Sequence, residues 1–248
     1  MDRMIAVVTG AGRGIGKAIA LALATNGYET ILVSRSGNEI EDVARSILSL
    51  GGKAIPLTCD IANPRSVTSL TKQIQSTIGK VSVIINNAGI APSLKIENTS
   101  DEIWRETFAT NVDGAFYIIR DFLPGMKSSG SGHIINIAST SALEGFAYTA
   151  AYTASKHALL GLSRAIAKEL SRSNIKISTI CPGFVRTSIL EQSVANIVAK
   201  TGKDQTAAEN QLGKMNRNGR IIAPEEVASA VLSELDQPLD PNGRELVL

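Results

Sequence analysis

The chain has 248 residues, a length that accommodates one large α/β domain with a sizeable core. Apolar residues make up 44% of the sequence and charged residues 19%, as in ordinary globular proteins, which argues against wholesale disorder. The formal net charge is only +2, from 25 basic and 23 acidic side chains, and it does not predict a nucleic-acid-binding surface.

The sequence predicts neither export, membrane insertion nor a disulfide framework. No apolar run approaches the roughly eighteen residues that a membrane-spanning helix requires. Residues 1–4 lead into a short apolar stretch without a secretory cleavage pattern. The two cysteines, Cys59 and Cys181, each stand at the end of an apparent strand and are expected to be reduced and buried. We therefore expect a soluble cytoplasmic protein.

Seven short apolar runs, rich in Val and Ile and mostly continuous, predict strands that are buried on both faces. In chain order these are residues 5–9, 30–34, 54–58, 81–86, 132–137, 176–180 and 244–248. Segments with helical periodicity lie between them, at residues 16–26, 38–50, 64–78, 100–128, 151–173 and 224–235. The alternation predicts a single Rossmann-type, doubly wound α/β domain over residues 1–248, with a seven-stranded parallel sheet and helices on both faces.

One stretch departs from this alternation. Residues 187–220 form a mostly helical insertion between the sixth and seventh strands, and its second half is polar. An insertion at the carboxyl edge of an open α/β sheet is well placed to cover the ligand crevice, so we expect a substrate lid. The alternative is an ordinary surface excursion.

The first strand runs into a glycine-rich turn, and a helix follows at once. Glycine residues there permit a tight turn and let backbone N–H groups approach a pyrophosphate, to which the helix N-terminus adds its positive dipole end. A strand, a glycine turn and a helix in this order predict dinucleotide binding. The cofactor-binding residues expected in this turn are Gly10, Gly12, Arg13, Gly14, Ile15 and Gly16.

The end of the second strand indicates which nicotinamide cofactor binds. NAD-binding units usually place Asp or Glu there to accept hydrogen bonds from the ribose 2′-hydroxyl, whereas this chain has Ser34 and Arg35. A guanidinium suits a 2′-phosphate through a bidentate contact. Arg13 either reaches the same phosphate or is a solvated loop arginine. We expect NADP(H).

Several motifs together resemble the short-chain dehydrogenase/reductase family. They are the glycine turn at 9–16, Asn86-Asn87-Ala88-Gly89, Asn111, Ser139, Tyr152-Thr153-Ala154-Ser155-Lys156, and Pro182-Gly183 with Thr187. They occur in the family's order and spacing over essentially the whole chain. Within the family the sequence looks most like bacterial 3-oxoacyl-[acyl-carrier-protein] reductases and related ketoreductases.

The side chains themselves indicate carbonyl chemistry. Tyr152 and Lys156 are four residues apart in a helical segment and so face the same way. An ammonium near a phenol favours the phenolate, so we expect Lys156 to lower the pKa of Tyr152 from near 10. Tyr152 would then exchange a proton at neutral pH, and Ser139 would donate a hydrogen bond to the substrate oxygen.

The resemblance implies further roles. Lys156 would hold the nicotinamide ribose, and Asn111 would fix a water that passes protons to Lys156. Asp60 would receive the adenine amino group. The catalytic residues are then Asn111, Ser139, Tyr152 and Lys156. The cofactor site would also include Ile61, Asn87, Ala88, Gly89, Pro182, Gly183, Val185 and Thr187, together with Tyr152 and Lys156.

Other interpretations of these residues stay open. Ser139 is also typical of a turn or cap, and Ser141 is a rival for its role. Asn86 and Asn87 are also turn formers, and Asp60 is a candidate N-cap. The two histidines have no partners at metal-ligand spacing, so no metal site is expected.

The C-terminal end departs from the family pattern. Family chains often carry a glycine pair after the last strand, but this sequence stops at Leu248, inside that strand. The departure leaves the usual C-terminal contribution to subunit pairing and to pocket closure in doubt. The resemblance implies a homotetramer built partly on the helices at 100–128 and 151–173, with a homodimer as the alternative.

The expected function is NADPH-dependent reduction of a carbonyl, a 3-oxoacyl thioester or a related ketone, to a secondary alcohol. The partner is then a small molecule rather than a nucleic acid or a membrane. One alternative is oxidation of a secondary alcohol, such as a 3-hydroxy acid, sugar or steroid, with NAD(P)⁺. The other is a non-catalytic nucleotide-sensing protein on the same fold.

Overall fold

The computed structural model describes residues 4–238 and 242–248. Residues 1–3, part of the N-terminal stretch tested for a secretory pattern, and residues 239–241 lie outside the described part. The predicted fold class is confirmed: seven parallel strands form one sheet in the order β3-β2-β1-β4-β5-β6-β7. The strands are β1 Ile5–Thr9, β2 Glu29–Ser34, β3 Lys53–Thr58, β4 Val83–Asn86, β5 Gly132–Ile137, β6 Ile175–Cys181 and β7 Arg244–Val247.

The central strands β1 and β4 are continuous apolar runs of the sequence, whereas β6 also contains the buried polar residues Lys176, Ser178 and Thr179. All residues of β1, β4 and β6 are buried, because helices cover both faces of the sheet. The two edge strands, β3 and β7, are only partly buried. The strand order reverses between β1 and β4, which pair in parallel from Ala6↔Val83 to Val8↔Ile85. Ligands of open α/β sheets bind in the crevice at such a switch point, beyond the carboxyl ends of the strands.

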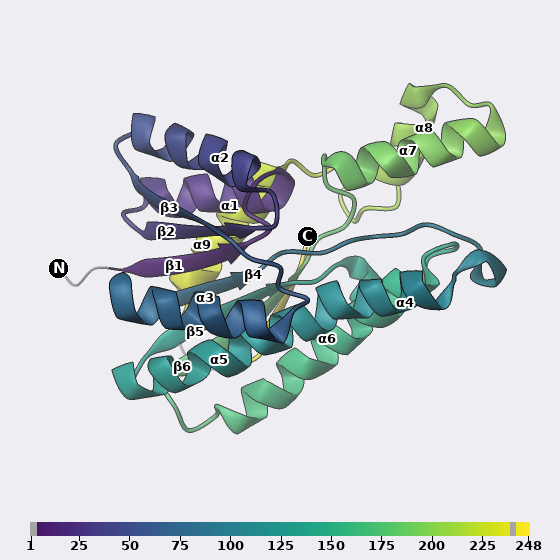
Figure 1. Ribbon diagram of the computed structural model, residues 1–248. Coiled ribbons are helices and arrows are strands. Elements are labelled where there is room, and N and C mark those ends of the chain that lie inside the picture. Colours follow the sequence, from purple (N-terminus) through teal and green to yellow (C-terminus); the bar gives the residue numbers. More distant parts are fainter. Residues whose placement is uncertain (1–3, 239–241) are drawn as a thin grey trace.

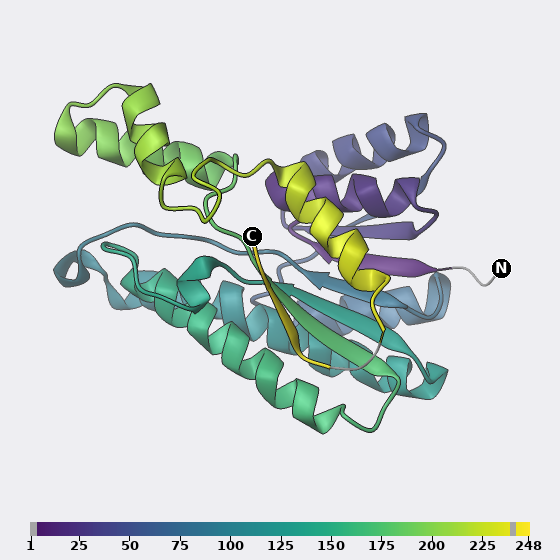
Figure 2. The ribbon, with the colours of Figure 1, turned by 180° about the vertical axis from the view of Figure 1, so that it is seen from behind.

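Helices cover the sheet in two layers (Figures 1 and 2). One layer contains α1 Gly14–Thr25, α2 Gly37–Ser49 and α9 Pro224–Leu235, whose apolar faces share a core with alternate strand residues such as Val8 and Ile135. The other layer contains α3 Pro64–Thr77, α5 Gly114–Ser129 and α6 Ala150–Glu169, which pack on residues such as Val7 and Ile134. Each face of the sheet therefore has its own apolar core.

The single helix expected at 100–128 is wrong in one respect. The structure divides it into α4 Asp101–Phe108, a π turn at Ala109–Asp113 and α5. The π turn contains Asn111, whose side chain hydrogen-bonds the backbone of Ile90 and the hydroxyl of Ser155. Helical periodicity does not register such a turn, because tertiary hydrogen bonds to distant segments accompany the widened backbone.

The predicted insertion between the sixth and seventh strands contains α7 Ser188–Thr201 and α8 Gln205–Gly213. Figures 1 and 2 show these two helices standing apart from the two layers that cover the sheet. They have a small apolar core of their own, formed by Leu190, Val194, Ala208 and Leu212. We refer to residues 187–220 as the α7–α8 excursion.

Candidate active site

The glycine turn between β1 and α1 lies at the switch point, and the side chain of Asn87 hydrogen-bonds its backbone. The backbone of Gly10 (φ +64°) and Gly14 (φ +52°) is in the left-handed region that favours glycine. The Asn87 amide donates to the carbonyl oxygens of Thr9 at 2.9 Å and Gly10 at 3.2 Å. A Cβ at Gly16 would lie 2.2 Å from the Gly10 oxygen, so only glycine lets α1 pack this closely on the turn. Asn87 thus stabilises the glycine turn through side-chain hydrogen bonds, in addition to its place in a turn of its own.

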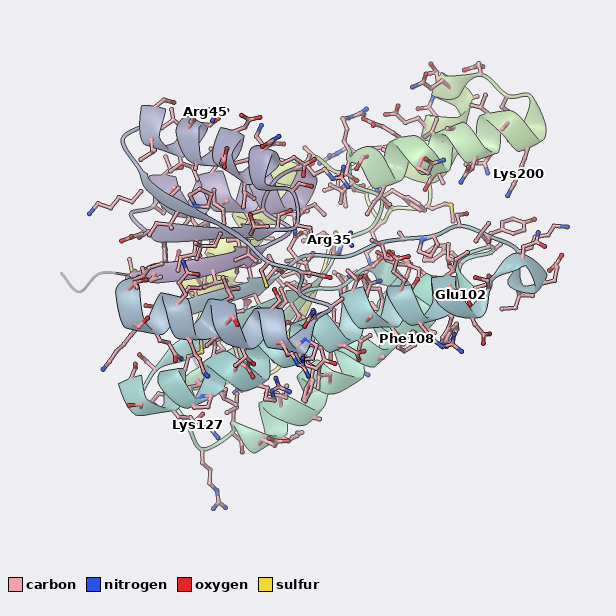
Figure 3. The ribbon with its side chains drawn as sticks, in the orientation of Figure 1. Arg35, Arg45, Glu102, Phe108, Lys127 and Lys200 are labelled. Carbon is pink, nitrogen blue, oxygen red and sulfur yellow. The ribbon has the colours of Figure 1, made fainter. Side chains whose placement is uncertain are left out.

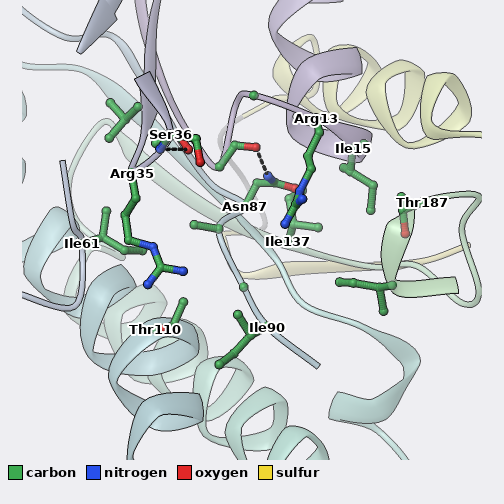
Figure 4. Close-up of a pocket in the computed structure, with 18 of the residues that line it drawn as sticks. Arg13, Ile15, Arg35, Ser36, Ile61, Asn87, Ile90, Thr110, Ile137 and Thr187 are labelled. Atoms are coloured by element: carbon green, nitrogen blue, oxygen red, sulfur yellow. Dashed lines mark hydrogen bonds between the residues drawn. The ribbon is translucent and has the colours of Figure 1, made fainter. Parts of the chain in front are cut away.

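A cavity of about 230 Å³ opens above this turn (Figure 4). It has the shape and donors that a dinucleotide needs: an open glycine turn, a helix N-terminus and cationic side chains. The predicted cofactor residues that line it are Gly10, Gly12, Arg13, Gly14, Ile15, Ser34, Arg35, Asp60, Ile61, Asn87, Ala88, Gly89, Tyr152, Lys156 and Thr187. Gly16 is buried under the turn instead, and Pro182, Gly183 and Val185 line a second, neighbouring cavity.

Arginine side chains in the cavity lining suit a phosphate. Figure 4 shows Arg35, from the end of β2, and Arg13, from the glycine turn, on different sides of the cavity. Arg13 lies 3.7 Å from Glu39 in the first turn of α2. The sequence interpretation missed Glu39, although a carboxylate four residues after Arg35 at a helix start was a visible signal. The lining of the cavity thus combines the two guanidinium groups with the carboxylates of Glu39 and Asp60.

Asp60 lies at the cavity wall just after β3, and it is not the N-cap of α3. Asn63 caps that helix and accepts hydrogen bonds from the N–H groups of Arg65 and Ser66. Asp60 instead accepts from the Ala62 N–H at 3.1 Å, within its own loop. The N-cap alternative for Asp60 is therefore wrong, and its carboxylate remains on the side of the cavity lined by Ile61.

The two cysteines are buried, as expected, and are poor nucleophiles. Burial is the main cause that raises the pKa of both thiols. The hydrogen bond between Cys59 and Ser66 and that between Cys181 and the Ser139 backbone only partly oppose this rise. A raised thiol pKa means little thiolate at neutral pH and therefore little reactivity.

Ser139, Tyr152 and Lys156 meet at the carboxyl end of β5. Ser139 lies two residues after the end of that strand, while Tyr152 and Lys156 lie one turn apart near the start of α6. The Lys156 side chain is buried, and its ammonium donates to the Ile137 carbonyl at 2.9 Å. Its nitrogen lies 5.7 Å from the centroid of the Tyr152 ring. The fold thus brings Ser139, Tyr152 and Lys156, which are spread over 18 residues of the sequence, close together.

The pKa of Tyr152 is raised in the structure, whereas the sequence interpretation expected Lys156 to lower it. Burial is the largest cause acting on the phenol and raises the pKa of Tyr152 above 10. A hydrogen bond from Ser139 lowers it only in part. Burial also lowers the pKa of Lys156 to about 8. Tyr152 therefore keeps its proton at neutral pH, which suits a proton donor better than a base.

The hydrogen bonding also distinguishes the two candidate serines. Ser139 is the serine that hydrogen-bonds the Tyr152 phenol. Its oxygen also accepts the Ser141 N–H at 3.1 Å, so a local turn orients the hydroxyl. Ser139 is therefore a turn residue that also lies beside Tyr152, and its hydrogen bond to a substrate oxygen stays a prediction.

Asn111 lies behind the reacting groups on the π turn. Its amide oxygen accepts the Ile90 N–H, and its amide nitrogen donates to the Ile90 carbonyl and the Ser155 hydroxyl, each at 2.9 Å. A Cβ built at Gly89 would lie 3.2 Å from the Asn111 oxygen and 3.7 Å from the Lys156 nitrogen. The absence of a side chain at Gly89 thus leaves space between Asn111 and Lys156.

A second cavity, of about 130 Å³, adjoins the first at Tyr152. Predicted site residues that line it are Ile15, Ser139, Tyr152, Pro182, Gly183, Val185 and Thr187. The sequence interpretation did not select Phe146 or Phe184, whose rings meet edge to face at 6.1 Å and form part of its wall. No motif marks them, because the two loops that carry them come together only in the folded chain.

Two further findings apply to the described residues alone. Within residues 4–238 and 242–248, no three His, Cys, Asp or Glu side chains are grouped so that they could bind a metal ion. Over the same residues, no helix has the length and apolar character that crossing a membrane requires.

The fold and the site together define an oxidoreductase-like, dinucleotide-binding α/β domain, and comparisons with known proteins identify its family. The model of the short chain dehydrogenase family matches residues 4–197. An uncharacterized oxidoreductase of Staphylococcus aureus (strain MW2) is 34% identical over 244 residues, which cover 98% of this chain and 96% of that protein. The chain belongs to the short-chain dehydrogenase family and is an oxidoreductase of that family.

Other relatives differ in what they act on. A 3β-hydroxysteroid dehydrogenase of Mediterraneibacter gnavus is 36% identical over 210 residues, covering 82% of this chain and 76% of that protein. Actinorhodin polyketide ketoreductase with NADPH superposes with a TM-score of 0.94 at 28% identity and covers 100% of this chain and 96% of that one. L-Sorbose reductase from Gluconobacter frateurii, complexed with NADPH and L-sorbose, has a TM-score of 0.92 at 27% identity, with 100% and 95% covered.

Proposed function

We propose that this protein is an NADPH-dependent reductase that converts a ketone, of the 3-oxoacyl thioester type or related to it, into a secondary alcohol. The observation that carries the proposal is the meeting of Ser139, Tyr152 and Lys156 at the junction of the two cavities. The first cavity has the donors and cations for a dinucleotide, and the second has room for a small molecule beside the Tyr152 phenol.

NADP(H) is the cofactor that the first cavity fits best. Arg35 and Arg13 supply positive charge where β2 and the glycine turn end, and no carboxylate ends β2. Three solved structures with NADPH or NADP bound superpose over at least 99% of this chain, among them the polyketide ketoreductase and the L-sorbose reductase described above. Lys156 would hold the nicotinamide ribose, and Pro182, Gly183, Val185 and Thr187 would bound the nicotinamide end.

The residues divide the chemical work between them. When bound, the reduced nicotinamide supplies a hydride, with its electron pair, to the carbonyl carbon and is oxidised. Ser139 donates a hydrogen bond to the carbonyl oxygen and orients it. Tyr152, whose raised pKa keeps it protonated at neutral pH, gives its proton to that oxygen, so the product is a neutral alcohol. Lys156 and the space beside Gly89 provide the route by which Asn111 and a water would return a proton to Tyr152.

The direction of reaction and the substrate class rest on two observations. The NADPH cofactor proposed for the first cavity favours reduction, in which the Tyr152 phenol acts as the acid. A 3-oxoacyl thioester is supported by the likeness to a polyketide ketoreductase. The 3β-hydroxysteroid dehydrogenase among the relatives supports the alternative, oxidation of a secondary alcohol by the same residues.

The α7–α8 excursion would act as the substrate lid. Ile189, Leu190 and Ser193 of α7 line the second cavity, so this helix forms one of its walls. For oligomerisation, Trp104 on α4 and Phe116 on α5 are exposed apolar side chains of the kind that a subunit contact covers. We propose a homotetramer through this helical face, with a homodimer as the alternative. The cytoplasmic location stays a prediction from the sequence.

The test is NADPH oxidation with acetoacetyl thioester, simple ketones and quinones. Replacing Tyr152 with Phe removes only the proton donor, so kcat should fall by about 10²–10⁴-fold while NADPH binding, followed by fluorescence titration, is kept. Tyr117→Phe is the matched control, because Tyr117 lies on α5 and lines neither cavity. Full activity of Tyr152→Phe would contradict the mechanism, and a strong preference for NADH would contradict the cofactor.

A further inference from the structure

Charge is divided sharply between the two cavities. The first is lined by Arg13, Arg35, Glu39, Asp60 and Lys156. None of the residues that line the second is charged; its polar groups are hydroxyls and backbone atoms. An ionised carboxylate or phosphate placed against this lining would therefore lose part of its hydration without gaining a counter-charge, which is unfavourable.

Aromatic and aliphatic side chains form the wall of the second cavity. The Phe146 and Phe184 rings are inclined at 76°, with centroids 6.1 Å apart, and Ile189 and Leu190 of α7 line the same cavity. An apolar group that enters the cavity would exchange water for contact with these side chains. Burial of that kind contributes about 25 cal/mol for each Å² of apolar surface.

Asn216 holds this wall in place. It is almost fully buried, and its amide oxygen accepts the Phe184 N–H at 2.7 Å. Its amide nitrogen donates to the carbonyl oxygens of Phe184 at 2.9 Å and Arg220 at 2.7 Å. A Cβ at Gly183 would lie 2.1 Å from the Asn216 oxygen, so the two residues are packed without spare room. The backbone position of Phe184 is thus set by Asn216, near the C-terminal end of the α7–α8 excursion.

The size of the second cavity limits the group that it can accept. Its volume is about 130 Å³. An apolar cavity of roughly 150 Å³ in another protein binds benzene, so the space here corresponds to about one six-membered ring or a short alkyl chain. A fused multi-ring group exceeds it unless the wall moves.

We infer that the substrate is a ketone that is uncharged on the side entering the second cavity and carries there an apolar group of about one ring, packed on Phe146 and Phe184. This inference rests on the proposed carbonyl reduction and deepens it. It separates neutral ketones and 3-oxo esters or thioesters from free 3-oxo acids and from sugar phosphates. It also separates single-ring ketones from steroid-sized ones.

Matched pairs of ketones test the inference with the intact protein and NADPH. Acetophenone should have a kcat/KM at least about a hundredfold above that of 4-acetylbenzoate, because only the latter brings an unpaired carboxylate into the cavity. Ethyl acetoacetate should exceed acetoacetate by a similar factor for the same reason. Acetophenone should also exceed 2-acetylnaphthalene, whose second ring does not fit.

A variant of the wall provides the second measurement. Phe184→Ala should lower kcat/KM for acetophenone by roughly tenfold, through KM, and raise the relative rate with 2-acetylnaphthalene, since removing the ring enlarges the cavity. With acetone, which has little surface to pack on the wall, the same variant should lose less kcat/KM than it loses with acetophenone. Phe184→Leu, which keeps an apolar side chain of similar bulk, should recover most of the acetophenone activity.

The possible results separate this inference from the proposed function. Equal kcat/KM for acetophenone and 4-acetylbenzoate would overturn the inference and leave carbonyl reduction standing. So would equal losses of Phe184→Ala with acetone and with acetophenone. If none of the ketones is reduced while NADPH still binds, the proposed function itself fails and the inference falls with it.

Discussion

Glu234, Lys176 and Arg244 form a buried ionic cluster between α9 and strands β6 and β7, and we expect a large loss of stability when one of its charges is removed. Glu234, near the end of α9, is fully buried and lies 3.0 Å from the Lys176 ammonium and 3.1 Å from the Arg244 guanidinium. It also accepts a hydrogen bond from Ser178 at 2.7 Å. Glu234→Gln keeps the shape of the side chain and removes its charge. Lys176, itself only 2% exposed, then has no counter-charge within the cluster.

The magnitude follows from the distance and the burial. Two unit charges 3.0 Å apart attract each other by roughly 5 kcal/mol at an effective dielectric constant near 20. Removing one partner of a buried ion pair usually destabilises a protein by about 3–5 kcal/mol, since the remaining charge stays desolvated. In a chain of this length each kcal/mol lowers the melting temperature by about 2–4 °C, so a decrease of roughly 6–20 °C is expected.

The effect should depend on pH in a defined way. Burial raises the pKa of Glu234, but its bonds to Ser178, Lys176 and Arg244 outweigh burial, so the pKa in the folded chain lies below the usual 4.5. The stability that the carboxylate contributes is therefore complete above about pH 4.5 and is lost as the pH falls through the lower folded pKa. The difference in melting temperature between parent and variant should be constant from pH 7 to 5 and shrink below that range.

Thermal unfolding followed by circular dichroism at these pH values is the assay. Glu169→Gln, at the exposed end of α6, is the control and should shift stability by no more than about 0.5 kcal/mol. A melting temperature of Glu234→Gln within 2 °C of the parent would contradict this prediction, because it would mean that Lys176 regains hydration or another partner.

Two further predictions concern the site. Gly89→Ala places a methyl group 3.2 Å from the Asn111 oxygen and 3.7 Å from the Lys156 nitrogen. Because the methyl group would displace these two groups, kcat should fall at least about tenfold in steady-state assays. An unchanged kcat would show that the space between Asn111 and Lys156 is not needed. Lys200, labelled on α7 in Figure 3, lies 4.7 Å from the centroid of the Tyr148 ring, and this contact joins the α7–α8 excursion to the loop before α6. Such a contact contributes about 0.5–1 kcal/mol, so Lys200→Gln should raise KM by roughly two- to fivefold with kcat unchanged; an unaltered KM would count against the lid.

The backbone of Tyr148 adds weight to the last prediction. Tyr148 has φ +68°, the only positive value among the non-glycine residues that the structure describes. An aromatic residue in that region is strained by about 1–3 kcal/mol and is retained when the surroundings hold it. Its carbonyl oxygen accepts the Leu94 N–H at 2.8 Å, and its ring meets Lys200. Three segments at the rim of the second cavity therefore converge on one residue.

The sheet, the alternation of strands and helices, and the glycine turn of the first cavity could all be predicted from local sequence patterns. Continuous Val- and Ile-rich runs specify buried parallel strands, and glycines at a strand-to-helix turn specify a backbone that few other residues adopt. Tyr152 and Lys156 were also within reach of sequence reasoning, because two residues four apart on a helix must face the same way. In each case the signal is local in the chain.

Three features depend on how distant segments pack together: the π turn at Asn111, the raised pKa of Tyr152, and the wall formed by Phe146 and Phe184. Asn111 is bonded to Ile90 and Ser155, which are 21 and 44 residues away in sequence. Burial and cross-chain hydrogen bonds, which set a pKa, arise only when distant segments pack together. Phe146 and Phe184, which would select the substrate, also depend on tertiary packing, because their contact forms between two loops rather than within a sequence motif.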